Sequence, residues 1–273
     1  MVSKHRRVLV TGGSSGIGAA LVDALLASGE TVIATTRKPE QQVERTNLQW
    51  LALDLNDPDS VTALLDHPIW ETPLDAVVNN AGYGLIAPIE SAAMDAVRDQ
   101  FEANFFATIA MTQHAMAHFR TYQQGTLMVV TSIGGRMAFP YFGYYNATKH
   151  ALEAVYEALW YECIGSGIRV RIIEPGFTQT QFATHGMQTS GTDDPIHTQG
   201  LQWLSNAMKS GTTATPPAVI GQVMKSALEC TSDQLRFAAG KHAGTLLTAR
   251  KILPDRWFSS LIAKAVMRGQ KAG

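Results

Sequence analysis

Short apolar segments alternate with amphipathic stretches over the first two thirds of the chain, and this alternation limits the fold more than any other feature. The apolar segments, which we interpret as strands, are residues 8–10, 31–35, 48–53, 75–79, 126–131 and 168–173. The stretches with helical spacing are 18–28, 94–120, 144–164 and a shorter one that Asp57-Pro58 opens. Apolar strands separated by helices are typical of a parallel sheet covered on both faces. The pattern predicts an α/β fold with a Rossmann-type, doubly wound sheet, whose ligands bind at the carboxyl ends of the strands.

The pattern changes after Pro175-Gly176. Residues 177–215 are rich in Gly, Thr, Gln and Ser and have weak periodicity, so we interpret them as a variable insertion. A helix from Pro216-Pro217 to Leu228, a last strand at 234–238 and a basic helical tail at 253–273 follow. Because no repeat or linker divides the chain, we expect residues 1–273 to form a single domain.

Composition excludes several classes of protein. The net charge is −1 and the pI about 6.7, whereas a nucleic-acid-binding domain usually has a pI above about 9. The two cysteines, Cys163 and Cys230, are too few for a zinc site or a disulfide scaffold, and their apolar helical surroundings favour buried thiols. The first residues lack a signal-peptide pattern, and the uncharged stretch 103–119 is too short to span a membrane. We expect a cytoplasmic protein with no transmembrane segment and no nucleic-acid partner.

A glycine-rich turn, Thr11–Gly18, joins the first strand to the first helix. A phosphate needs close approach of the backbone, which glycine permits, and the helix N-terminus adds free N–H groups and the positive end of its dipole. The spacing T-G-x-x-x-G-x-G differs from the common G-x-G-x-x-G pattern, but the strand–turn–helix context favours a dinucleotide. The expected contacts are Gly12, Ser14, Ser15, Gly16, Ile17 and Gly18.

An acid–base pair is predicted on the helix at 144–164. Tyr145 and Lys149 are four residues apart and share a face of that helix. A tyrosine has an ordinary pKa near 10, and a nearby cation lowers it, so we expect Tyr145 to serve as a general acid/base. Ser132, at the end of the strand 126–131, can donate a hydrogen bond to a substrate oxygen on which negative charge develops.

Together these motifs resemble the classical short-chain dehydrogenase/reductase family. The motifs occur in the expected order: Thr11–Gly18, Asp54, Asn79-Asn80-Ala81-Gly82, Asn104, Ser132, Tyr145-x-x-x-Lys149 and Pro175-Gly176-x-x-x-Thr180. The resemblance implies that Tyr145 exchanges the proton, that Ser132 orients the carbonyl and that Asn104 anchors a proton-relay water. It implies that Lys149 also binds the nicotinamide ribose. The remaining cofactor contacts it implies are Asp54 and Leu55 at the adenine, Asn80, Ala81 and Gly82 at the adenosine, and Pro175, Gly176, Thr178 and Thr180 toward the nicotinamide end.

The end of the second strand bears on the choice of cofactor. An acidic residue there binds the ribose hydroxyls of NAD, whereas an arginine accommodates the 2′-phosphate of NADP. Here the strand runs into Arg37-Lys38, with no acid before Glu40. The guanidinium of Arg37 suits a bidentate phosphate contact, so the sequence favours NADP(H) over NAD(H).

The substrate is expected to be a small hydrophobic ketone or aldehyde, or the corresponding alcohol. The resemblance places the substrate-binding segment at 177–215, and apolar side chains there and before Tyr145 could line a pocket. These side chains are Phe182, Met187, Trp203, Met208, Tyr141 and Phe142. Residues 34–39, Arg236-Phe237 and the long tail also look similar to the branch that contains 17β-hydroxysteroid and retinol dehydrogenases. The resemblance further implies a homodimer or homotetramer formed through the helices at 94–120 and 144–164.

Some alternatives remain open. A non-catalytic NADP-sensing regulator with the same fold would not need Ser132, Tyr145 and Lys149, and a sugar-nucleotide epimerase or dehydratase usually has a different glycine spacing. His114 and His118 are four residues apart but lack the glutamate of H-E-x-x-H and a third ligand, so we expect no metal site. The amphipathic stretch 257–267, with basic residues around it, could meet a membrane or a partner, although packing on its own domain or forming a lid is the commoner arrangement.

Overall fold

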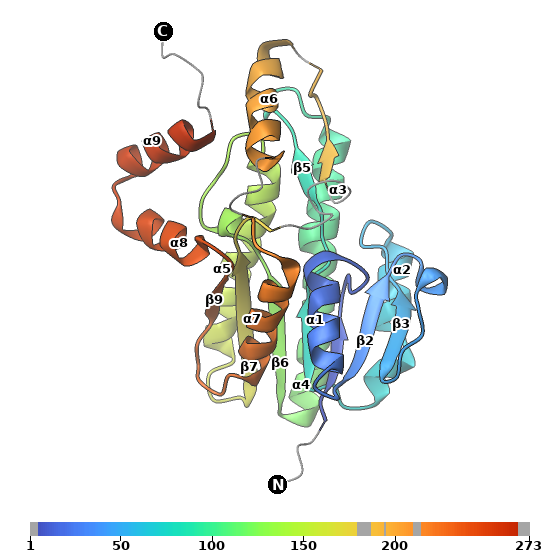
Figure 1. Ribbon diagram of the computed structural model, residues 1–273. Helices are drawn as coiled ribbons and strands as arrows, with labels where there is room; N and C mark the ends of the chain where they lie inside the picture. The colour runs from blue at the N-terminus through green and yellow to red at the C-terminus, as the bar shows by residue number, and fades with distance from the viewer. Residues whose placement is uncertain (1–4, 179–186, 194, 210–213, 267–273) are drawn as a thin grey trace.

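Seven parallel strands form one sheet in the order β3-β2-β1-β4-β6-β7-β9 (Figure 1). The computed structural model describes residues 5–178, 187–193, 195–209 and 214–266. The strands are β1 (Arg7–Val10), β2 (Thr31–Thr36), β3 (Leu48–Ala52), β4 (Ala76–Asn79), β6 (Gly125–Val130), β7 (Ile168–Pro175) and β9 (Arg236–Ala239). The strand order reverses between β1 and β4, and ligands of such sheets bind at this switch point. The Rossmann-type, doubly wound fold expected from the sequence is confirmed.

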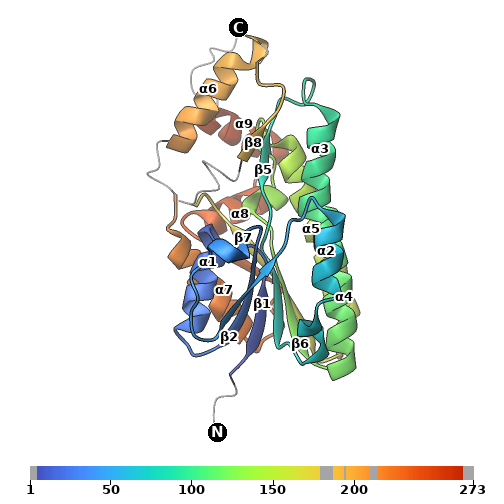
Figure 2. The ribbon, with the colours of Figure 1, turned by 90° about the vertical axis from the view of Figure 1, so that its right-hand side faces the viewer.

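Helices cover both faces of the sheet (Figures 1 and 2). On one face lie α1 (Gly16–Leu26) and α7 (Pro217–Glu229), and on the other α2 (Pro58–Leu65), α4 (Ala107–Tyr122) and α5 (Gly143–Glu162). Successive side chains of a strand point to opposite faces, so Val8 and Val10 pack with α1 and α7, while Leu9 packs with the α4–α5 side. This two-sided burial is the reason that the strands are apolar throughout.

The helical stretch expected at 94–120 is present, but it is not a uniform α-helix. It consists of α3 (Met94–Phe101), a π-helical turn at Glu102–Phe106, and α4. A π-turn carries one extra residue, and such turns occur frequently at functional sites. The turn contains Asn104, which is one of the predicted site residues.

The insertion at 177–215 has more regular structure than its weak periodicity predicted. Strand β8 (Met187–Thr189) pairs with β5 (Gly84–Ile86) in a second, two-stranded sheet, and helix α6 (Pro195–Lys209) follows. The Ser91 hydroxyl donates to the carbonyl of Gly191 over 2.9 Å, which ties this segment to the loop after β5. Three-residue strands are too short to show periodicity in a sequence, which explains why they were not predicted.

The tail is helical, as expected, and packs on its own domain. It forms α8 (Ala243–Ile252) and α9 (Asp255–Val266), which lie to one side of the sheet in Figure 1. Ala243 of α8 and Phe258 and Ile262 of α9 are buried in a cluster with Ile133 and Met137. The C-terminal helices therefore pack directly against the turn that follows β6.

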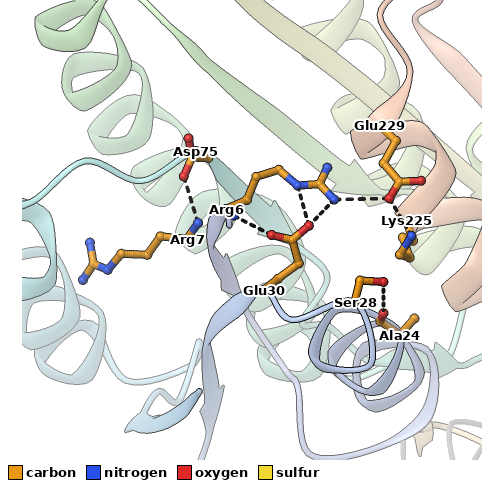
Figure 3. Close-up of polar contacts among 8 residues, drawn as sticks. All are labelled: Arg6, Arg7, Ala24, Ser28, Glu30, Asp75, Lys225 and Glu229. Carbon is orange, nitrogen blue, oxygen red and sulfur yellow. Dashed lines mark hydrogen bonds and ion pairs between the residues drawn. The ribbon is translucent and has the colours of Figure 1, made fainter. Parts of the chain in front are cut away.

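A charged cluster fixes the opposite end of the sheet (Figure 3). The Arg6 guanidinium donates to one oxygen of Glu30 over 2.9 Å from Nε and 2.6 Å from Nη2, and it lies 3.4 Å from Glu229 at the end of α7. Lys225 also donates to Glu229. The cluster joins the start of β1 to α7, far from the carboxyl ends of the strands.

Only one of the two cysteines matches the expected burial. Each cysteine directly follows the last residue of a helix, α5 for Cys163 and α7 for Cys230. Cys163 is buried, whereas Cys230 is half-exposed because it lies beyond the apolar face of α7. Within the described residues, no helix is both long and apolar enough to span a membrane.

Candidate active site

The glycine turn after β1 is held in a shape that only glycine allows at two positions. Gly12 has a φ of +67°, in the left-handed region. A Cβ on Gly18 would lie 2.1 Å from the carbonyl oxygen of Gly12, so the helix start and the turn pack without space for a side chain. Main-chain Gly13 donates to the carbonyl of Thr35 over 2.9 Å, which fixes the turn against the end of β2.

Asn80, after β4, closes the turn from the other side. Its amide donates to the carbonyls of Thr11 and Gly12 over 2.9 and 3.1 Å. The Thr11 hydroxyl accepts hydrogen bonds from the main-chain N–H groups of Asn80 and Ala81, both over 3.0 Å. These hydrogen bonds hold the glycine turn and the Asn80-Ala81 segment side by side, so that both could contact the same cofactor.

The start of α1 offers donors for an anion. Ser15 is its N-cap and, within the described chain, makes no side-chain capping hydrogen bond, and the first turn carries no acidic residue. Ser14 and Ser15 are both exposed. Main-chain N–H groups at such a helix start, together with the helix dipole, suit a phosphate. The donor set therefore fits the pyrophosphate of a dinucleotide.

Arg37 stands next to this turn because it follows β2 by one residue and Thr35 of β2 is bonded to Gly13. Its side chain is exposed and has no hydrogen bond or ion pair with any part of the chain that the structure describes. After the neighbouring strand β3, the side chain of Asp54 accepts from main-chain Asn56 over 3.0 Å, and Leu55 is half-buried. These three residues border the expected adenosine end.

Ser132, Tyr145 and Lys149 are brought together by β6 and α5. The Ser132 hydroxyl accepts from main-chain Gly134 over 3.0 Å and is hydrogen-bonded to the Tyr145 side chain. The ammonium of Lys149 lies 5.8 Å from the centre of the Tyr145 ring and donates to the carbonyl of Val130 over 3.0 Å. The three side chains therefore converge at the carboxyl end of β6, as predicted.

The electrostatics of this group differ from the expectation. Burial raises the pKa of Tyr145 to about 12, with the hydrogen bond from Ser132 opposing the rise. Burial also lowers the pKa of Lys149 to about 8, while the negative charge of Glu153 raises it. The expectation that the pKa of Tyr145 lies below its ordinary value is wrong for this arrangement, because burial disfavours the charged phenolate. At neutral pH the phenol is protonated and the ammonium is charged.

Asn104 is 1% exposed, and the π-turn directs its side chain to the loop after β4. Its amide donates to the carbonyl of Tyr83 over 2.8 Å, and its Oδ1 accepts from main-chain Tyr83 over 3.0 Å. A Cβ on Gly82 would lie 2.8 Å from that oxygen. Asn104 thus fixes the Gly82-Tyr83 segment beside the site, whereas contact with a relay water stays a prediction.

Two buried polar residues on α5 were not predicted as parts of the site. The Asn146 amide donates to the carbonyl of Gly134 over 3.0 Å and its Oδ1 accepts from main-chain Phe139 over 2.9 Å, which fixes the turn after Ser132. Glu153 is 4% exposed, accepts from Thr131 over 2.6 Å and from Arg236 over 2.9 Å, and lies four residues beyond Lys149. That i,i+4 spacing is the signal that could have identified Glu153.

The last predicted motif follows β7. Main-chain Gly176, next to Pro175, donates to the carbonyl of Ala239 over 2.9 Å, and the Thr178 hydroxyl donates to the carbonyl of Gly176 over 3.0 Å. Thr180 and Phe182 lie outside the described residues, as does the side chain of Met208. Met187 and Trp203 are half-buried on β8 and α6, and Tyr141 and Phe142 are half-buried before Tyr145.

The histidine pair on α4 has a structural role. Nε2 of His118 accepts a hydrogen bond from main-chain Leu74 over 3.0 Å, and both His114 and His118 pack edge-on against Trp70. Burial lowers the pKa of both imidazoles, which keeps them neutral at physiological pH. Among the described residues, no three His, Cys, Asp or Glu side chains lie close enough to hold a metal ion.

Comparison of the sequence with known protein families identifies one match. The family described as short chain dehydrogenase matches residues 6–190, which is more than half of the chain. The chain belongs to this family. It is thereby an oxidoreductase of the NAD(P)-binding, short-chain type. The resemblance drawn from the glycine turn and the tyrosine–lysine pair is confirmed at the level of the family.

Individual members of the family align along nearly the whole chain. The uncharacterized oxidoreductase YbbO of Escherichia coli (strain K12) is 31% identical, over 94% of each sequence. A short-chain dehydrogenase of Streptomyces avermitilis is similar in structure with a TM-score of 0.83 and 29% identity, covering 99% of this chain and 100% of that one. Another of Burkholderia cenocepacia J2315, in complex with NADP, has a TM-score of 0.75 at 22% identity, covering 97% and 99%.

A family member with a different cofactor shares the same fold. The short chain dehydrogenase of Leptospira borgpetersenii with bound NAD⁺ has a TM-score of 0.58 at 23% identity, covering 64% of this chain and 72% of that one. The solved structures that share this fold thus include one with NADP and one with NAD⁺.

Proposed function

We propose that this short-chain dehydrogenase interconverts a hydrophobic ketone or aldehyde and its alcohol with NADP(H), and that Tyr145 is the general acid/base. It would then act on the CH–OH group of its donors. The observation that carries the proposal is the convergence of Ser132, Tyr145 and Lys149 at the carboxyl end of β6, next to a glycine turn that fits a dinucleotide.

The side chains divide the chemistry between them. Bound NADP(H) supplies or accepts the hydride. In reduction, the Tyr145 hydroxyl donates its proton to the substrate oxygen, and its pKa of about 12 keeps that proton in place at neutral pH. The Ser132 hydroxyl donates a hydrogen bond to the same oxygen, and the Lys149 ammonium stabilises the phenolate that remains. In oxidation, the phenolate of Tyr145 accepts the proton instead.

The cofactor contacts are part of the proposal. The glycine turn and the start of α1 would hold the pyrophosphate through Gly12, Ser14, Ser15, Gly16, Ile17 and Gly18. Arg37 would bind the 2′-phosphate with its exposed guanidinium, which supports NADP(H) over NAD(H). Lys149 would contact the nicotinamide ribose. The other contacts would be Asp54, Leu55, Asn80, Ala81 and Gly82 along the adenosine, and Pro175, Gly176, Thr178 and Thr180 toward the nicotinamide.

The surroundings of Ser132 support a hydrophobic substrate. The next residues along the chain, Ile133, Met137 and Phe139, belong to an apolar cluster with α8 and α9, and Phe139 packs against Phe177. Apolar surroundings next to Ser132 favour an apolar ketone or alcohol over a charged one. Residues 34–39 and Arg236-Phe237 look similar to the hydroxysteroid and retinol dehydrogenase branch. This similarity agrees with an apolar substrate but does not identify a steroid or a retinoid.

We also propose that the protein is a cytoplasmic homodimer or homotetramer. Three large apolar side chains are exposed near the outer sides of α4 and α5, namely Phe106, Tyr161 and Ile164. Contacts through these helices would bury them. Light scattering coupled to gel filtration measures the assembly directly, and a monomer at all concentrations would contradict this part of the proposal.

The central test is Tyr145→Phe, which removes the proton donor and leaves the ring. We expect turnover in an NADPH-absorbance assay over hydrophobic ketones and aldehydes to fall by at least about 100-fold, with the Kd for NADPH nearly unchanged. Tyr122→Phe is the matched control, because its hydroxyl lies far from the site beside Glu71. Full turnover in Tyr145→Phe would refute the assignment. NADPH binding without turnover of any carbonyl by the unmodified protein would favour a cofactor-sensing regulator.

A further inference from the structure

The charges of the chain are divided unequally between its body and its C-terminal segment. Residues 243–273 contain six Lys and Arg and one Asp, a net charge of +5. Because the whole chain carries −1, residues 1–242 carry −6. A basic segment on an otherwise acidic protein would be drawn to a negatively charged surface while the body is repelled by it.

The same segment exposes large apolar side chains in its described part. Ile252 at the end of α8 is 72% exposed, and Trp257 and Leu261 of α9 are 64% and 43% exposed. Trp257, Leu261 and Lys264 are spaced by four and three residues, so they share one face of α9. Lys251, Arg256 and Lys264 are exposed around them, and the acid of the segment, Asp255, is paired with Arg250. These exposed residues at the end of α8 and on α9, namely Lys251, Ile252, Arg256, Trp257, Leu261 and Lys264, are together called the tail surface below.

The tail surface is presented in a fixed orientation. Phe258 and Ile262, on the adjoining face of α9, are buried in a cluster with Ile133 and Met137, which follow β6. The helix therefore does not need to detach in order to use its exposed face. Figures 1 and 2 show α8 and α9 beside the sheet end at which the carboxyl ends of the strands lie.

We propose that the tail surface docks on an anionic lipid bilayer, with α9 lying in the headgroup region. An interfacial helix needs an apolar face that includes Trp or Leu and flanking cations, and the tail surface supplies both. Tryptophan is suited to the boundary between headgroups and acyl chains, because its ring is apolar and its N–H is polar. Distributed cations attract lipid headgroups without the fixed partner geometry that a protein interface requires.

Docking would place the active site next to the source of an apolar substrate. The cluster that holds α9 includes Ile133, which directly follows Ser132, so the docked helix packs beside the turn that carries the proposed reaction centre. This consequence depends on the proposed function, but the docking itself does not. The binding test below therefore uses no activity readout.

The experiment is co-sedimentation of the full 273-residue protein with vesicles of phosphatidylcholine alone or mixed with phosphatidylglycerol. We expect binding to the mixed vesicles, weaker binding at high salt, and little binding to phosphatidylcholine. The triple variant Lys251→Gln, Arg256→Gln, Lys264→Gln should lower the partition coefficient on the mixed vesicles by on the order of 100-fold. The double variant Trp257→Ser, Leu261→Ser should also lower it and abolish any blue shift of tryptophan emission.

Matched controls separate the tail surface from general effects of charge and apolarity. The triple variant Arg45→Gln, Arg98→Gln, Arg120→Gln removes three exposed cations elsewhere, and Val43→Ser with Val219→Ser removes two exposed apolar side chains. Both should bind as the unmodified protein does. The proposal is overturned if the unmodified protein ignores anionic vesicles or if the control triple loses as much binding. It is equally overturned if the double variant dissociates an oligomer, since a second copy of the chain would then cover the tail surface.

Discussion

The hydroxyl of Thr131 donates a 2.6 Å hydrogen bond to Oε1 of Glu153, which joins the strand end that carries Ser132 to the helix that carries Lys149. The other oxygen of Glu153 accepts from Arg236 over 2.9 Å and lies 3.6 Å from Arg136. A buried carboxylate held in this way is a fixed negative charge behind the site. We propose that Glu153 influences the reaction through the pKa of Lys149 and does not itself contact the substrate.

Glu153→Gln should change the pH dependence of the reaction. Glu153 raises the pKa of Lys149, which burial lowers to about 8, so removal of its charge lowers that pKa further. The Lys149 ammonium is then lost at a lower pH, and the alkaline limb of the kcat/KM profile for carbonyl reduction should move toward neutrality. Glu157→Gln is the control, because Glu157 also binds Arg236 but does not contact Thr131. Superimposable profiles for Glu153→Gln and the unmodified enzyme would contradict a positioning role.

Glu174 predicts how stability depends on pH. Burial, followed by the charge of Glu153, raises the pKa of Glu174 from 4.5 to about 7, while Arg136 and Arg236 oppose the rise. The unfolded carboxyl therefore releases its proton at a lower pH than the folded one. Consequently the free energy of unfolding should fall by up to about 3 kcal/mol as the pH rises from about 4.5 to about 7. Glu174→Gln should remove this dependence in urea unfolding at pH 5 and 8, whereas the exposed Glu162→Gln should retain it.

The fold and the side chains of the candidate site could be predicted from the sequence because each has a local signature. Strands such as 8–10 are apolar on both faces, and Tyr145 and Lys149 are paired by helical spacing alone. The pKa of Tyr145 could not be predicted, because it depends on how deeply α5 and the turn after Ser132 bury the phenol. The π-turn around Asn104 and the pairing of β5 with β8 were also inaccessible, since both depend on contacts between distant segments.

Gly18→Ala should damage cofactor binding through the backbone. The new Cβ would lie 2.1 Å from the carbonyl oxygen of Gly12 and 2.5 Å from the Asn80 amide, so the turn or the helix must move. We expect the Kd for NADPH to rise at least about tenfold and the unfolding free energy to fall by about 1–3 kcal/mol. Gly244→Ala is the matched control, because nothing lies within 4 Å of a Cβ there, and it should stabilise α8 slightly. Equal NADPH affinities of the two variants would show that the turn tolerates a side chain.

Arg37→Asp tests the proposed preference for NADP(H) without requiring a known substrate. The change replaces an exposed guanidinium beside the glycine turn with a carboxylate, which repels a 2′-phosphate and can bind ribose hydroxyls instead. The ratio of the Kd for NADPH to that for NADH, measured by fluorescence titration, should rise by about 100-fold. Arg120→Asp makes the same change in charge at the end of α4, away from the carboxyl edge of the sheet, and should leave the ratio unchanged. If both variants shift the ratio equally, the effect comes from net charge and Arg37 does not contact the phosphate.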